Sequence, residues 1–208
     1  CIANGIPVRD FQRGDAVRAR LRAELGLGDA PTFVVVGRLN EQKNHALLLR
    51  AFADPRLSGA RLLVVGDGDL RADLEAQAAP LGERVRFLGI RRDVPDLLAA
   101  ADAFVLSSDW EGNPLVVMEA LSAGRAVVST AVGCVPELVS AETGLLIDAG
   151  DEAALVEALV GLATDPARTR ALGRAAAADA LARFDASVMA RAYVDLFERG
   201  TPGARGGS

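Results

Sequence analysis

Histidine and cysteine are scarce in this chain of 208 residues, and their scarcity limits the chemistry available to it. His45 is the single histidine, which excludes a metal site built from several histidines and disfavours a Ser-His-Asp hydrolase. The two cysteines, Cys1 and Cys134, are too few for a disulfide framework. Free thiols in a reducing compartment are the better interpretation, so we expect a cytoplasmic protein.

Long hydrophobic runs and an excess of positive charge are also missing. The longest apolar runs, residues 32–36 and 61–65, have the length of strands and are far too short to cross a bilayer. The net charge is −5, so no polybasic surface for nucleic acid or for an anionic membrane is expected. Aromatic residues make up only 4% of a chain that is 50% apolar, which indicates closely packed helices rich in alanine.

Strand-like and helix-like segments alternate through the first three quarters of the chain. Residues 32–36 form a continuous apolar run, as expected for a strand buried on both faces. We predict six strands, at 32–36, 61–65, 85–88, 103–106, 126–129 and 144–147. Helical segments separate them, so we expect an α/β fold with a doubly wound, mainly parallel, Rossmann-like sheet and helices on both faces.

Helices account for most of the remaining residues. Val17, Leu21 and Leu25 have the spacing of an amphipathic helix before the first strand. Further helices are predicted at 46–52, 70–79, 95–101, from Pro114, near Pro136, and at 151–163, 166–183 and 187–199. We therefore expect one domain over residues 1–199 and a flexible Gly/Pro-rich tail over 200–208. The first residues, beginning at Cys1 without Met, suggest a fragment of a longer protein.

The predicted topology gives the ligand site a location. In open parallel sheets, ligands bind beyond the carboxyl ends of the strands. The loops at that edge are 37–44, 66–69, 89–93, 107–113 and 130–136, and they are also the loops richest in glycine and polar residues.

Two glutamates, Glu111 and Glu119, bracket one of these loops and the helix that follows it. Asn113 suits the N-cap, and Pro114 suits the first helical position, where its missing N–H costs nothing. The free N–H groups and the positive dipole end of such a helix attract phosphate. A phosphate site flanked by two carboxylates matches a nucleotide sugar, whose diphosphate lies between a ribose diol and a hexose.

Each charged residue at this edge has a simpler interpretation. Glu119 lies among apolar neighbours, where a carboxylate is costly unless it is paired or bound to a ligand, and a structural salt bridge is the alternative to ribose binding. Glu111 can accept hydrogen bonds from a sugar, or it can simply favour the helix dipole. Arg38 and Lys43 can stabilise a diphosphate leaving group without a metal, or they can be solvated loop charges.

Three other features favour a structural role. Gly66-Asp67-Gly68 resembles a dinucleotide fingerprint, but the third glycine is absent and the turn follows the second strand, so NAD binding is disfavoured. Cys134 has the position of a reactive thiol at a helix start, but a small packing residue is favoured. His45, near another helix start, is a phosphate contact or a surface or capping histidine.

Taken together, these segments resemble a known family. Glu111–Glu119 matches the E-x7-E signature of retaining glycosyltransferases of the GT-B fold, group 1 (family 4). Asn4-Gly5-Ile6 is similar to the phrase that begins the family's C-terminal domain, and Val36-Gly37-Arg38-Leu39 with Lys43 is similar to its phosphate segment. Segments 64–68, 85–89 and 124–130 follow in the family's order, so the resemblance extends from about residue 4 to residue 197.

The resemblance implies a role for each matching residue. Arg38 and Lys43 would bind the donor diphosphate and stabilise the leaving nucleotide, Glu111 would contact the donor hexose, and Glu119 would hold the ribose. Backbone contacts to the donor are implied for Gly37, Gly89, Ile90, Arg91, Gly112, Asn113, Pro114 and Leu115. No metal and no other cofactor is implied. One departure is Gly133-Cys134 where the family has Gly-Gly, because a Cβ at Cys134 would restrict a position that favours positive φ.

The resemblance covers only the C-terminal, donor-binding half of a GT-B enzyme. The expected partners are a nucleoside-diphosphate sugar, with UDP favoured over GDP, and an N-terminal acceptor domain to which the helix at 187–199 would cross back. Nucleic acid is not an expected partner, and any contact with the inner membrane would come through that other half. A nucleotide-sugar 2-epimerase and a non-catalytic nucleotide-sugar sensor are the alternatives.

Overall fold

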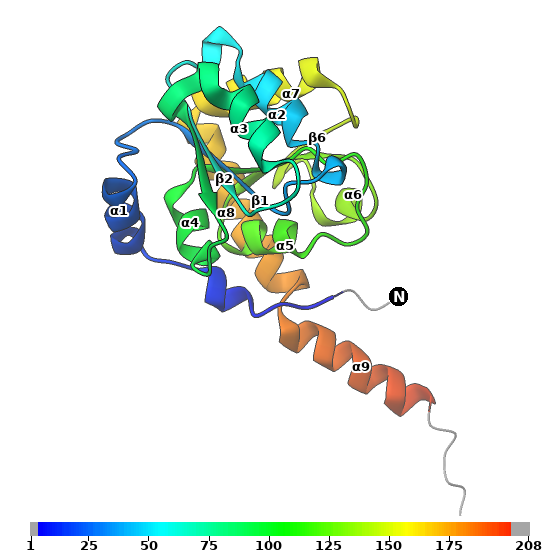
Figure 1. Cartoon of the computed structure of the whole chain (residues 1–208). Coiled ribbons are helices and arrows are strands. Elements are labelled where there is room, and N and C mark those ends of the chain that lie inside the picture. Colours follow the sequence, from blue (N-terminus) through cyan, green and yellow to red (C-terminus); the bar gives the residue numbers. More distant parts are fainter. Residues whose placement is uncertain (1–3, 201–208) are drawn as a thin grey trace, which may run out of the picture.

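Six parallel strands form one sheet in the order β3-β2-β1-β4-β5-β6 (Figure 1). The structure is a computed structural model that describes residues 4–200, with side chains as far as residue 197. The strands are β1 Thr32–Val36, β2 Arg61–Val65, β3 Val85–Gly89, β4 Ala103–Leu106, β5 Ala126–Thr130 and β6 Gly144–Ile147. All six predicted strands are confirmed, with β3 and β5 each one residue longer than expected.

The central strands are continuously apolar because helices cover both faces of the sheet. Val34, Leu63 and Phe104 lie in one buried cluster, and Phe33 and Val35 lie in the other. Successive residues of a strand point to opposite faces, so β1 contributes to both clusters in alternation. The register pairs Val34 of β1 with Leu63 of β2 and Phe104 of β4, which places the same face of each strand in the same cluster.

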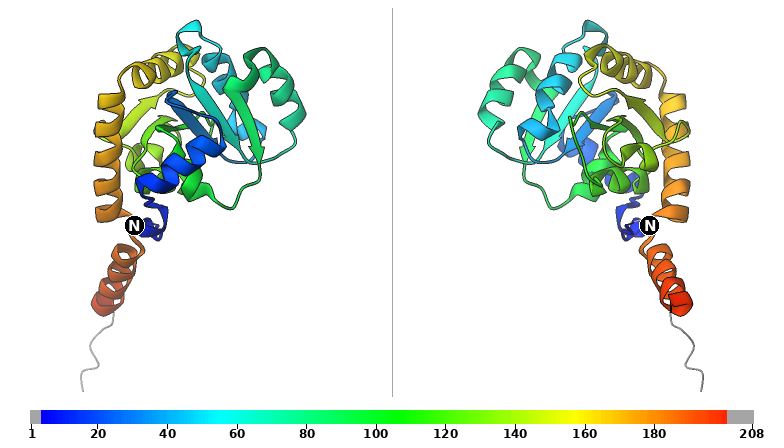
Figure 2. Two further views of the ribbon diagram at one scale, coloured as in Figure 1. Left: turned by 90° about the vertical axis from the view of Figure 1, so that its left-hand side faces the viewer. Right: turned by 90° about the vertical axis from the view of Figure 1, so that its right-hand side faces the viewer.

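The helices divide into two layers around the sheet (Figure 2). One layer contains α1 Asp15–Glu24, α4 Val94–Ala100 and α5 Leu115–Ser122, and the other contains α2 His45–Phe52, α3 Arg71–Ala78 and α7 Glu152–Thr164. The short helix α6 Val135–Leu138 follows β5. Helix α8 Pro166–Arg183 joins the layers, because Leu172 belongs to one cluster and Ala176 and Ala180 to the other. Among residues 4–200, none of the helices has the length and apolar character needed to cross a membrane.

The predicted N-cap of α5 is wrong. The N-cap of α5 is Pro114, with φ −73° and ψ 99°, and its helix starts at Leu115. Asn113 therefore lies outside the cap and makes no capping hydrogen bond, because the extended backbone of Pro114 delays the helix by one residue. At the other end of the chain, Gly200 is still helical, and residues 201–208 of the predicted tail lie outside the described part.

Helix α9 Ala186–Gly200 projects away from the sheet and its two helical layers (Figures 1 and 2). Its first turn is held by the N-terminal segment: Ile6 donates from its N–H to the carbonyl of Phe184 at 2.8 Å and accepts from the N–H of Ala186 at 2.9 Å. Beyond that anchor, the apolar side chains of Tyr193, Val194 and Leu196 are exposed. The helix therefore presents apolar surface that this domain does not cover.

Two helical glycines allow a matched test of the packing between α8 and the α5–β5 turn. A Cβ added at Gly173 would lie 2.3 Å from the carbonyl oxygen of Gly124, whereas one added at Gly161 of α7 meets nothing closer than 3.9 Å. We expect Gly173→Ala to lower the free energy of unfolding by about 1–3 kcal/mol through overpacking. Gly161→Ala should raise it by about 0.5–1 kcal/mol, because alanine favours the helix. Urea unfolding of both variants gives the comparison, and equal effects would contradict it.

Candidate functional site

The polar loops meet between the neighbouring strands β1 and β4, where the order of the strands in the sheet reverses. The crossover from β1 leads to α2 on one face, and the crossover from β4 leads to α5 on the other. The loops after these two strands therefore diverge, and a ligand crevice is expected between them. The loop after β1 contains Arg38 and Lys43, and the loop after β4 contains Glu111 and Gly112, as the sequence predicts.

Side chains tie these two loops together. The hydroxyl of Ser107 donates to the carbonyl of Lys43 or Asn44, each 3.0 Å away, and the side chain of Asn44 donates to Asp109 at 2.8 Å. Gln42 donates to the carbonyl of Trp110 at 2.9 Å. This network fixes the position of Lys43 relative to the loop after β4.

Lys43 and Glu111 form the central ion pair of the site. Lys43 Nζ lies 2.5 Å from Glu111 Oε1, and the hydroxyl of Ser108 donates to the same oxygen at 2.7 Å. The side chains of Lys43 and Glu111 are only 16% and 6% exposed, so both charges are largely removed from water. Glu111 Oε2 makes no hydrogen bond to the described residues and remains available as an acceptor.

Arg38 does not join that pair. Its guanidinium lies 3.3 Å from Asp69 Oδ2, and both side chains are strongly exposed, 66% and 82%. Exposed ion pairs of this kind contribute little to stability. Arg38 is therefore free to exchange Asp69 for a more highly charged partner at low cost.

Sequence reasoning missed that Asp67 and Asp69 have Asp-x-Asp spacing, which places two carboxylates, a common type of metal ligand, in one loop. In the structure Asp67 accepts from Arg71 at 3.2 Å and from the N–H of Gly68 at 2.8 Å, and Asp69 pairs with Arg38. Among the described residues, no group of three or more His, Cys, Asp or Glu side chains is placed to hold a metal ion.

Gly66 and Gly68 allow the loop after β2 to lie directly against the loop after β1. A Cβ at Gly66 would come 1.9 Å from the carbonyl oxygen of Gly37, and one at Gly68 would come 2.3 Å from that of Leu39. Two backbone hydrogen bonds join the loops, from Leu39 to Asp67 and from Leu70 to Leu39, each 3.0 Å. The glycines thus serve backbone packing beside the site, in a tight turn between a strand and a helix.

The structure removes the concern raised by Cys134. The residue with positive φ in this loop is Gly133, at +55°, where a Cβ would come 2.0 Å from the carbonyl oxygen of Glu111. Cys134 has an ordinary φ of −85°, carries a free thiol, and donates its N–H to the carbonyl of Gly112 at 3.0 Å. Cys134 therefore imposes no backbone strain. The other cysteine of the chain, Cys1, lies outside the described residues.

Glu119 is a carboxylate without a partner. It lies on α5, half-buried, and its side chain makes no hydrogen bond or ion pair with the described residues. Burial alone raises the pKa of Glu119 above its ordinary value. The predicted alternative, a structural salt bridge, is therefore absent from the described part of the chain.

Backbone donors are available next to the ion pair. The N–H groups of Gly112, Asn113 and Leu115 make no hydrogen bonds within the described residues. Pro114, buried at the N-cap, has no N–H, so it shapes this cradle without donating to it. Three donors at the start of α5 can therefore point at an anion.

The loop predicted to meet the base follows β3. Gly89 has a φ of +64° and accepts a 2.8 Å hydrogen bond from the N–H of Gly66, which holds it at the sheet edge. Ile90 is 79% exposed. The guanidinium of Arg91 is paired through two hydrogen bonds with Asp93, at 2.6 and 2.8 Å, so its backbone rather than its charge is available to a ligand.

His45, which the sequence placed near phosphate or at the surface, is buried in the α2 layer. It is 2% exposed, and neither ring nitrogen has a hydrogen-bond partner in the described residues. Burial, with a smaller contribution from the Lys43 charge, lowers its pKa to about 4. Both a surface position and a direct phosphate contact are therefore disfavoured.

Comparison with known proteins identifies the family. A model of the family described as glycosyl transferases group 1 matches residues 30–165. The chain belongs to the group 1 glycosyltransferases. Its sheet is the Rossmann-like unit found in glycosyltransferases of the GT-B type, as the sequence predicts.

This glycosyltransferase chain is similar to proteins whose names mention different nucleotides. It is 34% identical over 198 residues to the lipopolysaccharide core biosynthesis glycosyltransferase LpsD of Rhizobium meliloti, covering 93% of this chain and 57% of that protein. It is 30% identical over 212 residues to a GDP-mannose-dependent monoacylated alpha-(1-6)-phosphatidylinositol monomannoside mannosyltransferase of Corynebacterium glutamicum, covering 95% and 55%. The crystal structure of Anabaena Alr3699/HepE in complex with UDP superposes with a TM-score of 0.88 at 27% identity, covering 95% and 57%.

The glycosyltransferase chain thus spans somewhat more than half the length of the relatives it matches. All of the residues that the sequence analysis assigned to the donor lie at one edge of its sheet, while Arg38 is turned toward Asp69.

The buried histidine gives the glycosyltransferase domain a predictable response to acid. Because the folded-state pKa of His45 is about 4 and its ordinary value is 6.5, the unfolded chain binds the proton first as pH falls. Stability from this group is therefore lost between pH 6.5 and 4. We expect wild type to lose about 2 kcal/mol more than His45→Leu between pH 7.5 and 5. Urea unfolding at both pH values measures this, and parallel losses would contradict it.

Proposed function

We propose that this chain is the donor-binding half of a retaining glycosyltransferase that transfers a hexose-type sugar from a nucleoside-diphosphate sugar. The observation that carries the proposal is Glu119, a half-buried carboxylate without a partner on the helix whose first N–H groups are free. Burying such a charge is costly, and the cost is recovered when a ligand supplies donors. The adjacent 2′ and 3′ hydroxyls of a ribose match the two oxygens of one carboxylate.

The diphosphate fits between this ribose position and the ion pair. The N–H groups of Gly112, Asn113 and Leu115 and the dipole of α5 favour an anion there. Lys43 has three donor positions, and its contact with Glu111 uses one of them. In this proposal Lys43 and Arg38 stabilise the negative charge that develops on the leaving nucleotide, which is the role a metal ion performs in other enzymes.

Glu111 then serves the sugar. Its Oε1 is occupied by Lys43 and Ser108, which orient the carboxylate, while Oε2 is left to accept from a hydroxyl of the donor hexose. Ordering by two fixed donors is what a group needs to hold a reacting sugar in one geometry. Retention at the anomeric carbon and independence from metal are part of the proposal.

UDP is the favoured donor nucleotide because the HepE structure was solved with UDP. GDP is the second candidate because the similar Corynebacterium enzyme is named as GDP-mannose-dependent. We propose that the base is read by the backbone of Gly89, Ile90 and Arg91, since the Arg91 guanidinium is already paired with Asp93.

An N-terminal domain completes the enzyme in this proposal. The chain covers only 57% and 55% of these relatives, and α9 presents exposed Tyr193, Val194 and Leu196 that the donor half does not cover. That domain would supply the acceptor site and the other wall of the catalytic cleft, in the cytoplasm. The alternative function, a nucleotide-sugar 2-epimerase, is disfavoured. The ion pair of Lys43 with Glu111, together with Glu119, fits transfer of a sugar from a bound donor.

Glu119→Gln should weaken nucleotide binding and stabilise the empty domain. Loss of a charged acceptor for the ribose should reduce UDP affinity at least about tenfold, measured by calorimetric titration with UDP, GDP and ADP. Because the folded-state pKa of Glu119 is raised, its stabilising contribution belongs to the protonated form and is lost as pH rises. At pH 7 the substitution should therefore increase the free energy of unfolding.

Glu83→Gln is the matched control, because Glu83 is exposed and its side chain makes no hydrogen bond or ion pair with the described residues. It should leave both UDP affinity and stability within experimental error. A Glu119→Gln variant that binds all three nucleotides as wild type does would remove the central support for this function.

The 208-residue chain should bind nucleotide but transfer little or no sugar by itself, because half of the proposed cleft is missing. Donor turnover by this chain and by a longer protein containing an N-terminal domain, measured with the same acceptor extract, tests this. Robust transfer by the short chain would show that the donor half alone is sufficient.

A further inference from the structure

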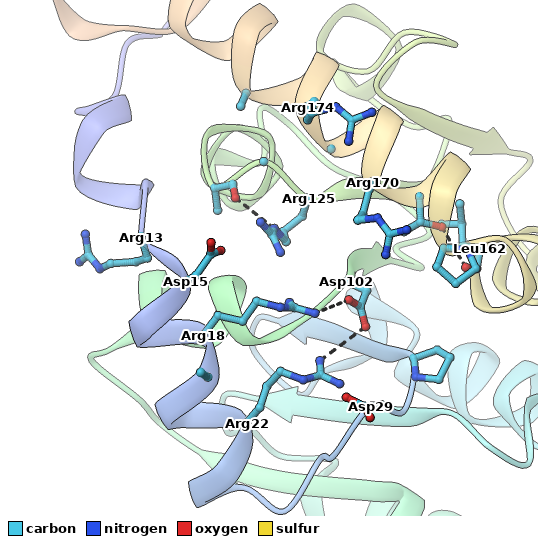
Figure 3. Close-up of a pocket in the computed structure, with 18 of the residues that line it drawn as sticks. Arg13, Asp15, Arg18, Arg22, Asp29, Asp102, Arg125, Leu162, Arg170 and Arg174 are labelled. Carbon is cyan, nitrogen blue, oxygen red and sulfur yellow. Dashed lines mark hydrogen bonds and ion pairs between the residues drawn. The ribbon is translucent and has the colours of Figure 1, made fainter.

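A groove of about 1150 Å³ opens at the amino-terminal edge of the sheet, opposite the donor site (Figure 3). It is bounded by α1, by the start of α8, and by residues that immediately precede strands, namely Pro31 before β1, Asp102 before β4 and Arg125 before β5. Strands of this length separate the two edges by roughly 15 Å. The groove is therefore not part of the donor site described above.

Arginine dominates the groove, although the chain as a whole is acidic. Six arginines and three aspartates line it, so its net charge is positive, while the chain carries −5. The arginines are Arg13, Arg18, Arg22, Arg125, Arg170 and Arg174. A concave surface lined by one sign of charge concentrates ligands of the other sign.

Some of these arginines have structural partners. Arg18 donates to the carbonyls of Ala99, Ala100 and Ala101 at the end of α4, at 2.7–3.1 Å, and to Asp102 at 2.6 Å. Arg22 donates to carbonyls of the loop between α1 and β1 and to that of Ala100 in α4, and it also lies 3.6 Å from Asp102. Asp102 also accepts a hydrogen bond from the N–H of Thr32 at 2.8 Å. Its charge is therefore paired within the fold.

Arg125 is different, because no carboxylate lies within ion-pair distance of it in the described residues. It donates to the carbonyls of Ala123 and Ala101, at 3.0 and 2.7 Å, and its Nη2 makes no hydrogen bond there. Burial and the neighbouring charge of Arg18 lower its pKa to about 10. A guanidinium that is desolvated next to another cation and lacks a counter-ion gains from the arrival of an anion.

Two further arginines face the same space from α8. Arg170 and Arg174 are one helical turn apart, so they share a face of the helix. Figure 3 shows the side chain of Arg170 extending into the groove between Arg125 and Asp102. Neither Arg170 nor Arg174 makes a side-chain hydrogen bond or ion pair with the described residues, so their donors are available.

The carboxylates of the groove do not neutralise this cluster. Asp29 lies toward Arg22 at the far end (Figure 3). The carboxylates that act on Arg125 are Asp102, which is already occupied by other donors, and Asp15. Arg125, Arg170 and Arg174 therefore face one unpaired acid. Between them, the walls are apolar, formed in part by Ala19, Leu162 and Ala163.

We propose that this groove is a second ligand site, which binds a phosphate group carried on a small organic body through Arg125, Arg170 and Arg174. Guanidinium groups bind phosphate oxygens in a bidentate manner, and these three arginines line the same groove. The apolar walls and the volume of the groove accommodate more than the phosphate itself. The body is a soluble metabolite or the head-group region of a lipid, which present the same chemistry.

The test follows the arginine Nε–Hε resonances of the ¹⁵N-labelled 208-residue chain during titration with inorganic phosphate at constant ionic strength. We expect the signal of Arg125 to shift in a saturable manner. Arg170→Gln should weaken this binding at least fivefold, and the variant should fold because Arg170 is exposed and unpaired in the described structure. Lys43→Ala should leave it unchanged, which separates this groove from the donor diphosphate site.

Arg168→Gln is the matched control, since it removes the same charge from an exposed position of the same helix that does not line the groove. It should weaken phosphate binding less than twofold. Absence of an Arg125 shift, equal losses in the Arg168 and Arg170 variants, or abolition of the binding by Lys43→Ala would each overturn the proposal.

Vesicles of phosphatidylcholine, with and without phosphatidylglycerol, distinguish the two sources of phosphate. Co-sedimentation that requires phosphatidylglycerol and is lost in Arg170→Gln would assign the groove to a lipid head group. A saturable Arg125 shift with inorganic phosphate, without such co-sedimentation, would assign it to a soluble phosphorylated molecule.

Discussion

The reversal of strand order between the parallel strands β1 and β4 is the constraint on which the rest of this molecule depends. Strands β2 and β3 extend the sheet to one side of β1, and β5 and β6 extend it from β4 to the other. Because the two crossovers leave toward opposite faces, a ligand crevice is expected between the loops after β1 and β4. Polar groups must span that crevice, and the pair of Lys43 and Glu111, supported by Ser108, does so.

Incomplete pairing of charges distinguishes the ligand-facing parts of this fold from its structural parts. Asp102 is surrounded by donors and helps to hold α1 to the sheet, so its burial is compensated. Glu119 and Arg125 are each removed from water without a counter-charge in the described residues. They lie at opposite edges of the same sheet, and each belongs to a region where free donors or acceptors converge. Burial of a charge without a counter-charge costs stability, and such a cost is recovered where a ligand supplies the missing partner.

Helix α9 carries apolar surface that the proposed N-terminal domain would cover. The helix is anchored through Ile6, Phe184 and Ala186, yet its distal apolar side chains have no covering layer in this domain. In the proposed complete enzyme, that surface and the exposed edge around Arg38 face the other domain. Docking of that domain and binding of the donor can then replace the exposed ion pair of Arg38 with Asp69.

The sequence by itself determined the strands, the two-faced sheet and the edge at which the proposed donor residues gather. Buried parallel strands have continuous apolar runs, and the loops between them are polar and rich in glycine. It also identified Lys43, Glu111 and Glu119. Only the tertiary structure decided which of them touch, since the contact of Lys43 with Glu111 joins residues 68 positions apart. Likewise the burial of His45 and the groove around Arg125 depend on which segments the crossovers bring together, and local sequence carries no record of that.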